Sequence, residues 1–457
     1  MNRRKIQIIV LFQNLGQWRP WYAKSPAPPL TGLLLAALTP PIVEVEVLHE
    51  MVRPVDYATD ADCVALSFMD YCAPHAYEVA RRFRAAGKTV IAGGKYATSN
   101  PNDVQPHVDC VVVGEAERVW PRVVEDYVAG RLAERYDAPA APPLENLPPP
   151  RYDLAEKSFA VPVVTEATRG CPFQCSFCQL TVARTLFRMR PIADVVRDLK
   201  ATERLPWHKR RTAMLYDNNL GGDIGYAKEL LREMAKLKLL AWGAQFSFDC
   251  LHDTEFVDLL AASHCRMAFI GMESLNDLSL AHVHKTHNRV SEYRELFGRL
   301  RRRGILVFAG LMFGLDADTP EYLAGLSEQL REASPEVLLM SIAIPIPGTP
   351  WHREVAEAGR IVDLDLAHYE GDHLVFRPRL VGAAELLAAY RENNQRFFSR
   401  RATIGRWIRF LKAQPAFGLL PGSVLDTLIS TAIYFKLTAF QKHHAQRRVF
   451  NTTAGES

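Results

Sequence analysis

The sequence predicts an α/β protein in which a strand–helix alternation occurs twice and is followed by a helical tail. Runs rich in Val and Ile alternate with segments of helical spacing in the first 140 residues, and the alternation starts again at residue 161. A proline-rich stretch separates the two halves. We therefore expect a doubly wound, Rossmann-like domain at 1–140, a Pro-rich linker at 141–160, a partial (β/α)6 barrel at 161–350 and a mainly helical region at 351–457.

Five short runs in the first half are typical of buried parallel strands, because they are dense in Val and Ile. They are KIQIIVLF (5–12), VEVEVL (43–48), CVALSF (63–68), KTVIAGG (88–94) and DCVVVG (109–114). Helical spacing is found between them, at 31–38, 75–87 and 115–130. Any ligand of such a sheet is expected at the carboxyl ends of its strands. The stretch APAAPPLENLPPP (138–150) can neither continue a helix nor pair in a central strand, so it marks the linker.

Six further runs in the second half have the character of strands. They are VPVVTEAT (161–168), TAMLYD (212–217), GAQFSFD (243–249), MAFIGME (267–273), GILVFAGLMFG (304–314) and EVLLMSIAI (336–344). The segments expected to be helical are 191–203, 226–237, 254–263, 291–300 and 320–333. Six strand–helix units are fewer than the eight of a closed barrel, so we predict a partial barrel with its chemistry on the loops that follow the strands.

Composition and the N-terminal sequence argue against a nucleic-acid-binding protein and against a secreted one. The 55 basic and 51 acidic residues leave a net charge of +4, which is too small to argue for nucleic-acid binding. The N-terminal apolar run is interrupted by Gln7, Gln13 and Asn14 and lacks a small-residue cleavage site, so it is interpreted as a first strand and not as a signal peptide. We therefore expect a cytoplasmic protein, in which the eight cysteines are metal ligands or buried thiols.

The motif TRGCPFQCSFCQL (168–180) carries the strongest chemical signal. Cys171, Cys175 and Cys178 form C-x3-C-x2-C directly after a predicted strand. Three thiolates on one loop can hold three irons of a [4Fe–4S] cluster and leave the fourth iron open to a small molecule. The alternative is a structural zinc site, which needs four ligands. Cys250 or Cys265 could complete it, although each lies on or beside a predicted strand, as buried thiols often do.

With this cysteine motif and with Phe177 before its last cysteine, the segment 161–350 resembles the radical SAM superfamily. The resemblance implies that S-adenosylmethionine (SAM) binds the open iron and that an external donor such as flavodoxin or ferredoxin reduces the cluster. It also implies that cleavage of SAM yields a 5′-deoxyadenosyl radical, which abstracts a hydrogen from an unactivated carbon. The protein then positions the cofactors and excludes water.

The resemblance also implies further contacts to SAM. Asp217 and Asn218 in LYDNNLGGD match the place of the polar groups for the SAM amino end, and Glu273 in IGMES matches the position that usually bonds the ribose hydroxyls. Gln245 and Ser247 in QFSFD would line the barrel interior. A structural ion pair stays an alternative for Glu273, as does packing or solvation for Gln245 and Ser247.

In combination with this second half, the first half resembles a cobalamin-binding domain. The segments PPLTGLLLAALTP (28–40), GG-x3-T and DCVVVGEAE (109–117) match that subgroup in order. The resemblance implies cobalamin contacts from residues at the ends of strands, namely Ser67, Gly93, Gly94, Thr98, Gly114 and Glu115. The Asp-x-His-x-x-Gly motif that supplies a cobalt ligand is missing, because Asp70 and His75 are five residues apart. A vestigial or substrate-binding domain remains the alternative.

The C-terminal region has a different composition. Residues 396–449 contain ten Lys or Arg and one acid, Asp426. The apolar stretch within them is unsuited to spanning a membrane, because it contains Asp426, Lys436 and two prolines. It is compatible with peripheral contact at a membrane interface, and equally with a helix that caps the barrel with its apolar face inward. Residues 375–399 resemble the tail of hopanoid methylases.

These patterns favour a cobalamin-dependent radical SAM methyltransferase acting on a carbon of a lipid-like or secondary-metabolite substrate. The alternative enzyme uses the same cofactors for cyclisation, rearrangement or oxidation and resembles anaerobic magnesium-protoporphyrin monomethyl ester cyclase. A cluster-bearing scaffold protein would not cleave SAM. RNA methylthiolation is disfavoured, because Cys63, Cys72 and Cys110 lack cluster spacing and no basic RNA-binding appendage is evident. No catalytic acid or base is assigned.

Overall fold

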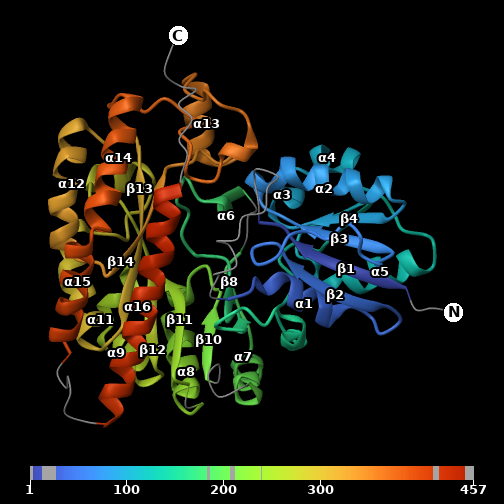
Figure 1. The fold of residues 1–457 in the computed structure, drawn as a ribbon, viewed down its shortest axis with the longest axis horizontal. Coiled ribbons are helices and arrows are strands. Elements are labelled where there is room, and N and C mark those ends of the chain that lie inside the picture. The colour runs from blue at the N-terminus through green and yellow to red at the C-terminus, as the bar shows by residue number, and fades with distance from the viewer. Residues whose placement is uncertain are drawn as a thin grey trace. The chain divides into compact units, whose positions relative to one another are not determined.

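The computed structural model of the chain describes residues 4–12, 27–182, 186–205, 211–237, 239–414 and 421–447, with side chains throughout except at 421–426, 440 and 443–447. The chain divides into two compact units. One comprises residues 1–166, 182–209 and 365–370, and the other residues 167–181, 210–364 and 371–457. Figure 1 traces their elements along the chain. Because the units interleave in sequence, the predicted boundaries at 140, 160 and 350 stay predictions.

The first unit contains a parallel sheet with the strand order β2-β1-β3-β4-β5-β6. The strands are β1 (Lys5–Val10), β2 (Glu44–His49), β3 (Cys63–Ser67), β4 (Thr89–Gly93), β5 (Cys110–Val113) and β6 (Arg135–Asp137). The first five confirm the five predicted runs. The sequence does not predict β6, because Tyr136 is its single buried side chain. The order reverses at β1, which defines a doubly wound sheet.

Helices cover both faces of this sheet. They are α1 (Leu30–Leu38), α2 (Ala73–Ala85), α3 (Lys95–Ser99), α4 (Pro101–Val104) and α5 (Trp120–Val128). Figure 1 shows α1 and α5 on one face and α2, α3 and α4 on the other. Helix α2 buries Ala76, Val79, Ala80 and Phe83, whose spacing of three and four residues forms one apolar stripe. The unit also includes β7 (Val163–Thr165), β9 (Arg188–Met189) and α7 (Ile192–Leu199).

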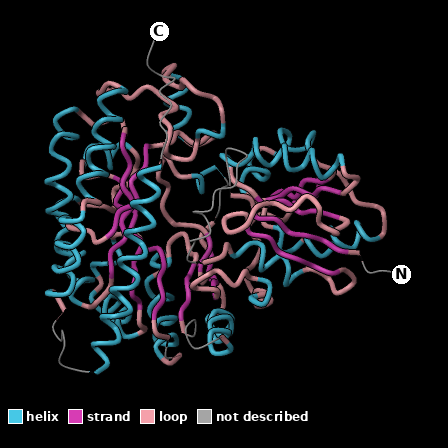
Figure 2. The backbone as a smooth tube through the Cα atoms, in the orientation of Figure 1, coloured by secondary structure: helices cyan, strands magenta, loops and turns pink. Residues whose placement is uncertain are grey.

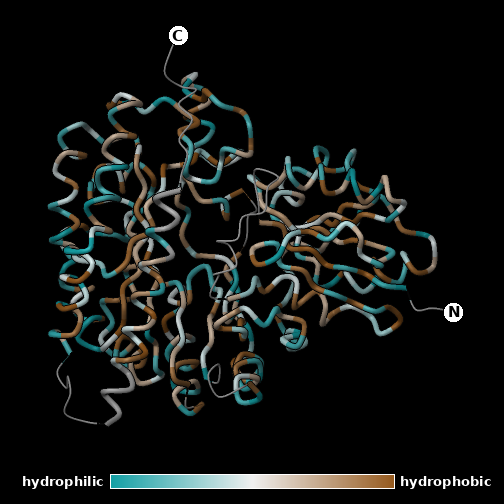
Figure 3. The backbone as a smooth tube through the Cα atoms, viewed as in Figure 1, coloured by the Kyte–Doolittle hydropathy of each residue, from teal (hydrophilic) through white to brown (hydrophobic). Residues whose placement is uncertain are grey.

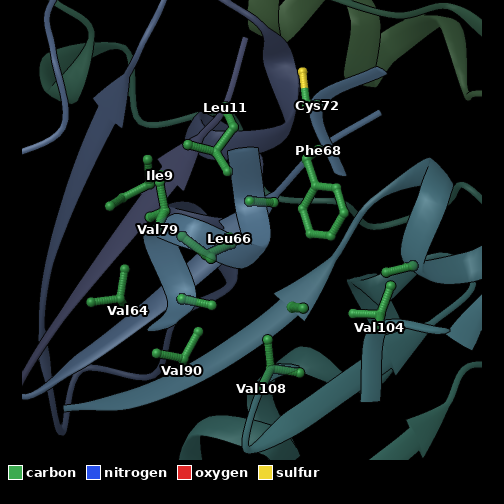
Figure 4. Close-up of a cluster of buried hydrophobic side chains, with 14 of the residues drawn as sticks. Ile9, Leu11, Val64, Leu66, Phe68, Cys72, Val79, Val90, Val104 and Val108 are labelled. Carbon is green, nitrogen blue, oxygen red and sulfur yellow. The ribbon is translucent and has the colours of Figure 1, made fainter. Parts of the chain in front are cut away.

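The core of the first unit lies between the sheet and α2. Figure 4 shows Leu66, Val79 and Val90 among the side chains that meet there. Phe68 and Cys72 extend this core into the loop that follows β3. Figure 3 shows the same division along the backbone, with hydrophobic residues along the strands and hydrophilic residues on the outward sides of the helices. Burial of this apolar surface therefore anchors the carboxyl ends of the strands, where the loops begin.

The second unit is built on parallel strands that neighbour one another in the order β14-β13-β12-β11-β10. They are β10 (Thr212–Leu215), β11 (Ala241–Phe246), β12 (Cys265–Glu273), β13 (Leu306–Phe313) and β14 (Val337–Ile342). Together with β7, these strands confirm all six runs predicted in the second half. The short strand β8 (Thr168–Arg169) lies directly before the cysteine motif.

Each of these strands except the last is followed by a helix that returns the chain. The helices are α8 (Ile224–Ala235), α9 (Thr254–Ala262), α10 (Asp277–His282), α11 (Tyr293–Arg302) and α12 (Pro320–Ala333), followed by α13 (Pro350–Glu357). Figure 2 shows the strands of this unit flanked by a layer of helices. Asp223, Asp253 and Thr319 cap α8, α9 and α12 by accepting backbone amides. The sequence does not predict the short helix α10.

The C-terminal helices are α14 (Ala383–Phe397), α15 (Arg400–Lys412) and α16 (Pro421–Arg447). Figure 1 shows α16 beside β14. Phe410, Leu411 and Tyr434 form a buried cluster with Leu306 and Val337, the first residues of β13 and β14. The tail therefore caps the sheet at the start of these strands, which is the second of the two alternatives open from the sequence. No helix of the described residues is long and apolar enough to cross a membrane.

Arg406 joins the tail to the sheet by directional bonds as well. Its Nε donates to the Glu336 carbonyl at 3.1 Å and its Nη1 to the Phe397 carbonyl at 2.7 Å. The guanidinium also lies 3.6 Å from the centroid of the Phe397 ring. A buried cation with two bonded donors and an aromatic face is costly to remove, because both carbonyls lose a charged partner.

We predict that Arg406→Ala lowers the free energy of unfolding by about 3 kcal/mol, through the loss of two charge-assisted bonds and of side-chain packing. Urea unfolding followed by circular dichroism measures this change. Arg400→Ala is the matched control, because Arg400 is exposed on the same helix, and it should change stability by no more than about 0.5 kcal/mol. Equal effects of the two substitutions would contradict the anchoring role of Arg406.

Candidate functional site

The cysteine motif forms one loop between β8 and the short helix α6 (Gln179–Val182). The loop begins at Gly170, whose φ of +87° is accessible to glycine at little cost. Cys175 is buried, whereas Cys171 and Cys178 are partly exposed. The Cys178 amide donates to the Cys175 carbonyl at 3.0 Å, which closes a turn around the last two thiols. Phe177 lies half-buried within that turn.

Segments far away in sequence hold this loop in place. The Ser176 amide donates to the Val283 carbonyl and the Ser176 carbonyl accepts from the Trp351 amide, both at 3.0 Å. The Phe173 ring stacks on the His287 ring with centroids 3.8 Å apart. Burial, followed by the nearby charge of Lys285, lowers the pKa of His287 to about 4, so the stacked imidazole is neutral near pH 7.

Burial and a nearby positive charge act on two of the thiols, Cys175 and Cys178. Burial raises the pKa of Cys175 to about 11 and also raises the pKa of Cys178, although the Lys285 ammonium opposes the shift at Cys175. Metal binding has to displace these protons, and a neighbouring cation stabilises the resulting thiolates. The loop therefore offers three thiols whose charged form is favoured when a metal compensates for their burial.

Among the described residues, the one trio of potential ligands whose atoms all lie within 4.8 Å of one another is His282, Asp316 and Glu354, and it contains no cysteine. Thiolates on a single zinc lie about 4 Å apart, because each Zn–S bond is about 2.3 Å. The three cysteines do not form such a group, so the preference for an iron–sulfur cluster over zinc rests on the number of thiols and their spacing along the chain.

Neither of the two cysteines considered as a fourth ligand is available in this unit. The Cys250 thiol is buried and donates to the Ser247 carbonyl at 2.9 Å. The Cys265 thiol is buried on β12 and donates to the Met267 carbonyl at 3.5 Å. The donor set of the loop therefore consists of three thiols, which fits a cluster that keeps one open corner.

The trio of His282, Asp316 and Glu354 is better explained as an ion-pair network than as a metal site. Both carboxylate oxygens of Asp316 accept from Arg360, at 2.9 and 2.6 Å. His282 Nε2 lies 3.0 Å from a Glu354 oxygen. Because Arg360 already neutralises the buried carboxylate, a cation would have to displace the guanidinium.

The residues after β10 fasten the start of the cysteine loop. The Asp217 carboxylate, 3% exposed, accepts from the Ala167 amide at 3.1 Å and from both the amide and the hydroxyl of Thr168. Asn218 Oδ1 accepts from the Gly170 amide at 3.1 Å. Both side chains that the sequence predicts as SAM contacts are thus bonded to the loop that carries the thiols.

The neighbouring Asn219 links this loop to the end of β11. Its Oδ1 accepts from the Ser247 amide at 2.9 Å, and its Nδ2 lies 3.8 Å from the Cys171 sulfur. Sequence reasoning missed Asn219, although it lies beside the two residues that were singled out. The buried Ser247 hydroxyl and Asp249 Oδ1 have no hydrogen-bond partner among the described residues. Unpaired buried polar atoms beside the thiols mark a place where a polar ligand can bind.

One face of the second sheet is incompletely covered near these residues. Gln245 is exposed although Ala244 and Phe246 on either side are buried, and Phe269, its neighbour on β12, is only partly buried. Alternating exposure within central strands is expected where a sheet curves around an interior space. Gln245 is exposed on its strand and Ser247 is partly exposed two residues further on, and their position in the barrel interior stays a prediction.

Glu273 ends β12 with a φ of +63° and pairs with Lys285, with the Nζ and Oε1 atoms 2.9 Å apart. Gly271 makes room for this pair, because a Cβ there would lie 2.3 Å from Glu273 Oε1 and 2.8 Å from Lys285 Nζ. Burial acts to lower the pKa of Lys285, but the negative charges of Glu273 and Cys175 outweigh it and raise the pKa. The ion pair that the sequence left as an alternative is present, and sequence reasoning missed Lys285.

In the first unit, the predicted residues gather at the carboxyl ends of β3, β4 and β5. Ser67 and Gly93 are direct neighbours on adjacent strands. The Thr98 hydroxyl donates to the Gly94 carbonyl at 2.8 Å and accepts from the Gly114 amide at 3.0 Å. The structure therefore brings five of the six predicted positions together, with the Thr98 side chain occupied in joining two of them.

A steric constraint explains why residue 94 is a glycine. Its φ is +97°, and a Cβ would lie 2.8 Å from the backbone nitrogen and oxygen of Phe68. Glu115, the sixth predicted position, forms an ion pair with Arg188, whose Nη1 lies 3.1 Å from Glu115 Oε2. The glycine at position 94 and the ion pair of Glu115 are both explained by contacts within this unit. Neither contact excludes a ligand at the same edge of the sheet.

His75 is held in place by a carboxylate on another segment of the first unit. It lies in the first turn of α2, is buried, and its Nε2 is 2.6 Å from Glu50 Oε1. This position agrees with the expectation that His75 lies at the beginning of a helix.

A parallel strand–helix unit that carries three fixed thiols at the carboxyl ends of its strands defines an enzyme with a metal cluster at an open site. The family model described as the radical SAM superfamily matches residues 165–330. The chain belongs to the radical SAM superfamily. The resemblance stated from the cysteine motif is confirmed.

Curated relatives cover most of the chain. Bacteriochlorophyllide d C-12(1)-methyltransferase of Chlorobaculum tepidum is 31% identical over 369 residues, which span 79% of this chain and 80% of that protein. The hopanoid C-2 methylase of Rhodopseudomonas palustris is 24% identical and spans 78% of this chain and 69% of its own. The anaerobic magnesium-protoporphyrin IX monomethyl ester cyclase of Rubrivivax gelatinosus is 24% identical over 74% of this chain and 66% of its own.

A solved structure shares the fold. The cobalamin-dependent S-adenosylmethionine radical enzyme OxsB superposes with a TM-score of 0.65 at 12% identity and covers 98% of this chain and 81% of its own. The predicted fold class is confirmed: an α/β chain with a Rossmann-like N-terminal part, a partial radical SAM barrel and a helical C-terminal region.

We predict that Cys175→Ala abolishes binding of the iron–sulfur cluster, because two thiols on one loop cannot hold a cubane. After anaerobic reconstitution, the variant should lack the brown absorbance and contain almost no protein-bound iron. Cys265→Ala is the control, since it removes a buried thiol from β12 and should retain full iron content. Retention of the cluster by Cys175→Ala would overturn the assignment.

We predict that Gly94→Ala destabilises the first unit by about 3 kcal/mol or more, since it combines a conformation available mainly to glycine with a backbone clash. Gly87→Ala is the matched control: Gly87 also has positive φ, +75°, but a Cβ there meets no atom within 4 Å. It should cost only about 1 kcal/mol. Thermal unfolding midpoints of the two variants give the comparison, and equal midpoints would refute the clash.

Proposed function

We propose that this radical SAM enzyme is a cobalamin-dependent C-methyltransferase that acts on an unactivated carbon of a lipid-like or secondary-metabolite substrate. The observation that carries the proposal is the set of three fixed thiols without a fourth thiol partner, combined with relatives named as methyltransferases across about four-fifths of the chain. The bacteriochlorophyllide and hopanoid names of two relatives support a large apolar substrate.

Cys171, Cys175 and Cys178 would hold a [4Fe–4S] cluster. When bound, the cluster and SAM would supply the radical that activates the substrate carbon, and cobalamin would supply the methyl group. The chain's own contribution is placement. Asp217 fixes the start of the loop, and the bonds of the Ser176 backbone fix its end.

We assign the SAM-binding surface to the side chains around this loop. Gln245, Ser247 and Glu273 lie at the carboxyl ends of β11 and β12, where Gln245 is exposed and the other two are partly exposed. The unpaired Ser247 hydroxyl and the unpaired oxygen of Asp249 would take up the polar groups of SAM. Asp217 and Asn218 would act on SAM through the loop, because their oxygens are already bonded to its backbone.

Cobalamin would bind at the carboxyl edge of the first sheet. Ser67, Gly93, Gly94, Thr98 and Gly114 are partly exposed there, at the edge where doubly wound sheets bind their ligands. Because the Asp-x-His-x-x-Gly motif is missing and His75 is buried in α2, we propose that His75 does not ligate the cobalt. An external flavodoxin or ferredoxin would deliver the electrons.

A second function with the same cofactors is favoured by one observation, the similarity to the magnesium-protoporphyrin monomethyl ester cyclases. Such an enzyme would close or oxidise a ring without methyl transfer. The two outcomes differ in what becomes of SAM: methyl transfer produces S-adenosylhomocysteine as well as 5′-deoxyadenosine, whereas cyclisation produces 5′-deoxyadenosine alone.

We predict that the anaerobically reconstituted protein converts SAM to S-adenosylhomocysteine and bound cobalamin to methylcobalamin when a strong reductant is present. Chromatography of the nucleosides and the visible spectrum of the corrinoid measure both products. Omission of cobalamin should abolish S-adenosylhomocysteine while leaving 5′-deoxyadenosine. Formation of 5′-deoxyadenosine without S-adenosylhomocysteine in the complete mixture would reject methyl transfer and favour the cyclase-type reaction.

A further inference from the structure

Helices α15 and α16 leave several large apolar side chains exposed. Ile404 and Ile408 lie one turn apart on α15, and Leu428 and Phe435 lie two turns apart on α16. Ile404, for example, is 50% exposed. The half-buried Trp407 connects the two helices, because its ring centroid lies 5.6 Å from that of Phe435. We call these four exposed side chains the tail surface.

The tail surface is not needed to hold the tail on the sheet. The inward faces of both helices are already occupied by the buried cluster around Phe410 and Tyr434. The Tyr434 hydroxyl donates to the Thr403 carbonyl at 2.7 Å, and Trp407 Nε1 donates to the Thr431 hydroxyl at 3.3 Å. Large apolar side chains that are exposed on two helices already anchored to the sheet lower the solubility of the protein. Binding of a partner to these side chains would remove them from water.

The charge around the tail surface is mainly positive. Residues 400–414 contain five Lys or Arg and no acid, and residues 426–442 contain two more Lys and one acid, Asp426. Arg400, Arg401 and Lys412 are exposed on α15, and Lys436 is exposed beside Phe435. Without these seven residues the chain would have 48 basic and 51 acidic side chains, so its positive charge is concentrated here. The complementary partner is an anionic surface.

We propose that the tail surface docks on an anionic lipid bilayer, with α15 and α16 lying at the interface. Apolar side chains on anchored helices would enter the region between headgroups and acyl chains, and the flanking basic side chains would contact the headgroups. The proposal does not depend on the methyltransferase assignment, because it uses none of the residues around the thiols.

Charge argues against a second copy of this chain as the occupant. A symmetric dimer would place the same surface on both sides of the contact, so the basic side chains of one copy would face those of the other. Like charges at close range oppose such an interface, whereas anionic headgroups neutralise it.

The test is binding of the full-length protein to vesicles of equimolar phosphatidylglycerol and phosphatidylcholine, measured by flotation at low salt. We expect binding to these vesicles, at least tenfold weaker binding to pure phosphatidylcholine, and loss of binding in 0.5 M salt because exposed charges are screened. Ile404→Glu and Phe435→Glu should each weaken binding at least tenfold. Arg401→Glu should weaken it through charge alone.

Ile42→Glu is the matched control, since Ile42 is also exposed, at 48%, but lies in the first unit. This variant should bind as the unaltered protein does, and circular dichroism should show that all variants are folded. Absence of vesicle binding, or binding that Ile404→Glu and Phe435→Glu leave unchanged, would overturn the proposal. So would gel filtration that shows a dimer which these substitutions dissociate, because a second copy would then cover the surface.

Discussion

One buried carboxylate organises the second unit around its thiols. Asp217 is almost inaccessible to water, and such a charge is tolerated only when donors surround it. The donors are the amides of Ala167 and Thr168 and the Thr168 hydroxyl, all of which lie just before the cysteine loop. If the loop moved away from the end of β10, the buried Asp217 carboxylate would lose its hydrogen-bond donors, which is energetically costly. Asn218 and Asn219 extend the same attachment to Gly170 and to the end of β11.

The buried ion pair of Lys285 and Glu273 sets the charge around the thiols. Lys285 pairs with Glu273, so the pair is neutral while the thiols are protonated. When the thiols ionise, the ammonium is the nearby cation that offsets part of their charge, and its influence on Cys175 opposes the effect of burial. Glu273 in turn keeps the ammonium charged within the interior. The pair thus permits a change of charge on the loop without a change in the packing around it.

The parts that could be predicted from sequence are those whose signal is local. The cysteine spacing lies within eight residues, and the strand runs are dense enough in Val and Ile to stand out one by one. β6 escaped prediction because Tyr136 alone is buried in it, and α10 because it is only six residues long. Lys285 escaped because its importance depends on Gly271 and Glu273, which reach it only through the tertiary fold. The sequence of the tail was compatible with two interpretations. Burial of Phe410 and Tyr434 against the sheet confirms capping for the inward faces of the tail helices, and the outward faces are those proposed to contact a membrane.

The GG-x3-T motif at the edge of the first sheet has both a structural explanation and a functional one. The spacing GG-x3-T places Thr98 one helical turn beyond Gly94, so that one hydroxyl joins the Gly94 carbonyl to the Gly114 amide. Gly94 is also required by the close approach of Phe68. The motif would therefore be needed to build this edge even without a ligand, and its presence alone is weak evidence for cobalamin. What gives it weight is that the same backbone, freed of side chains by these glycines, lies at the carboxyl ends of β3, β4 and β5, where a doubly wound sheet binds its ligand.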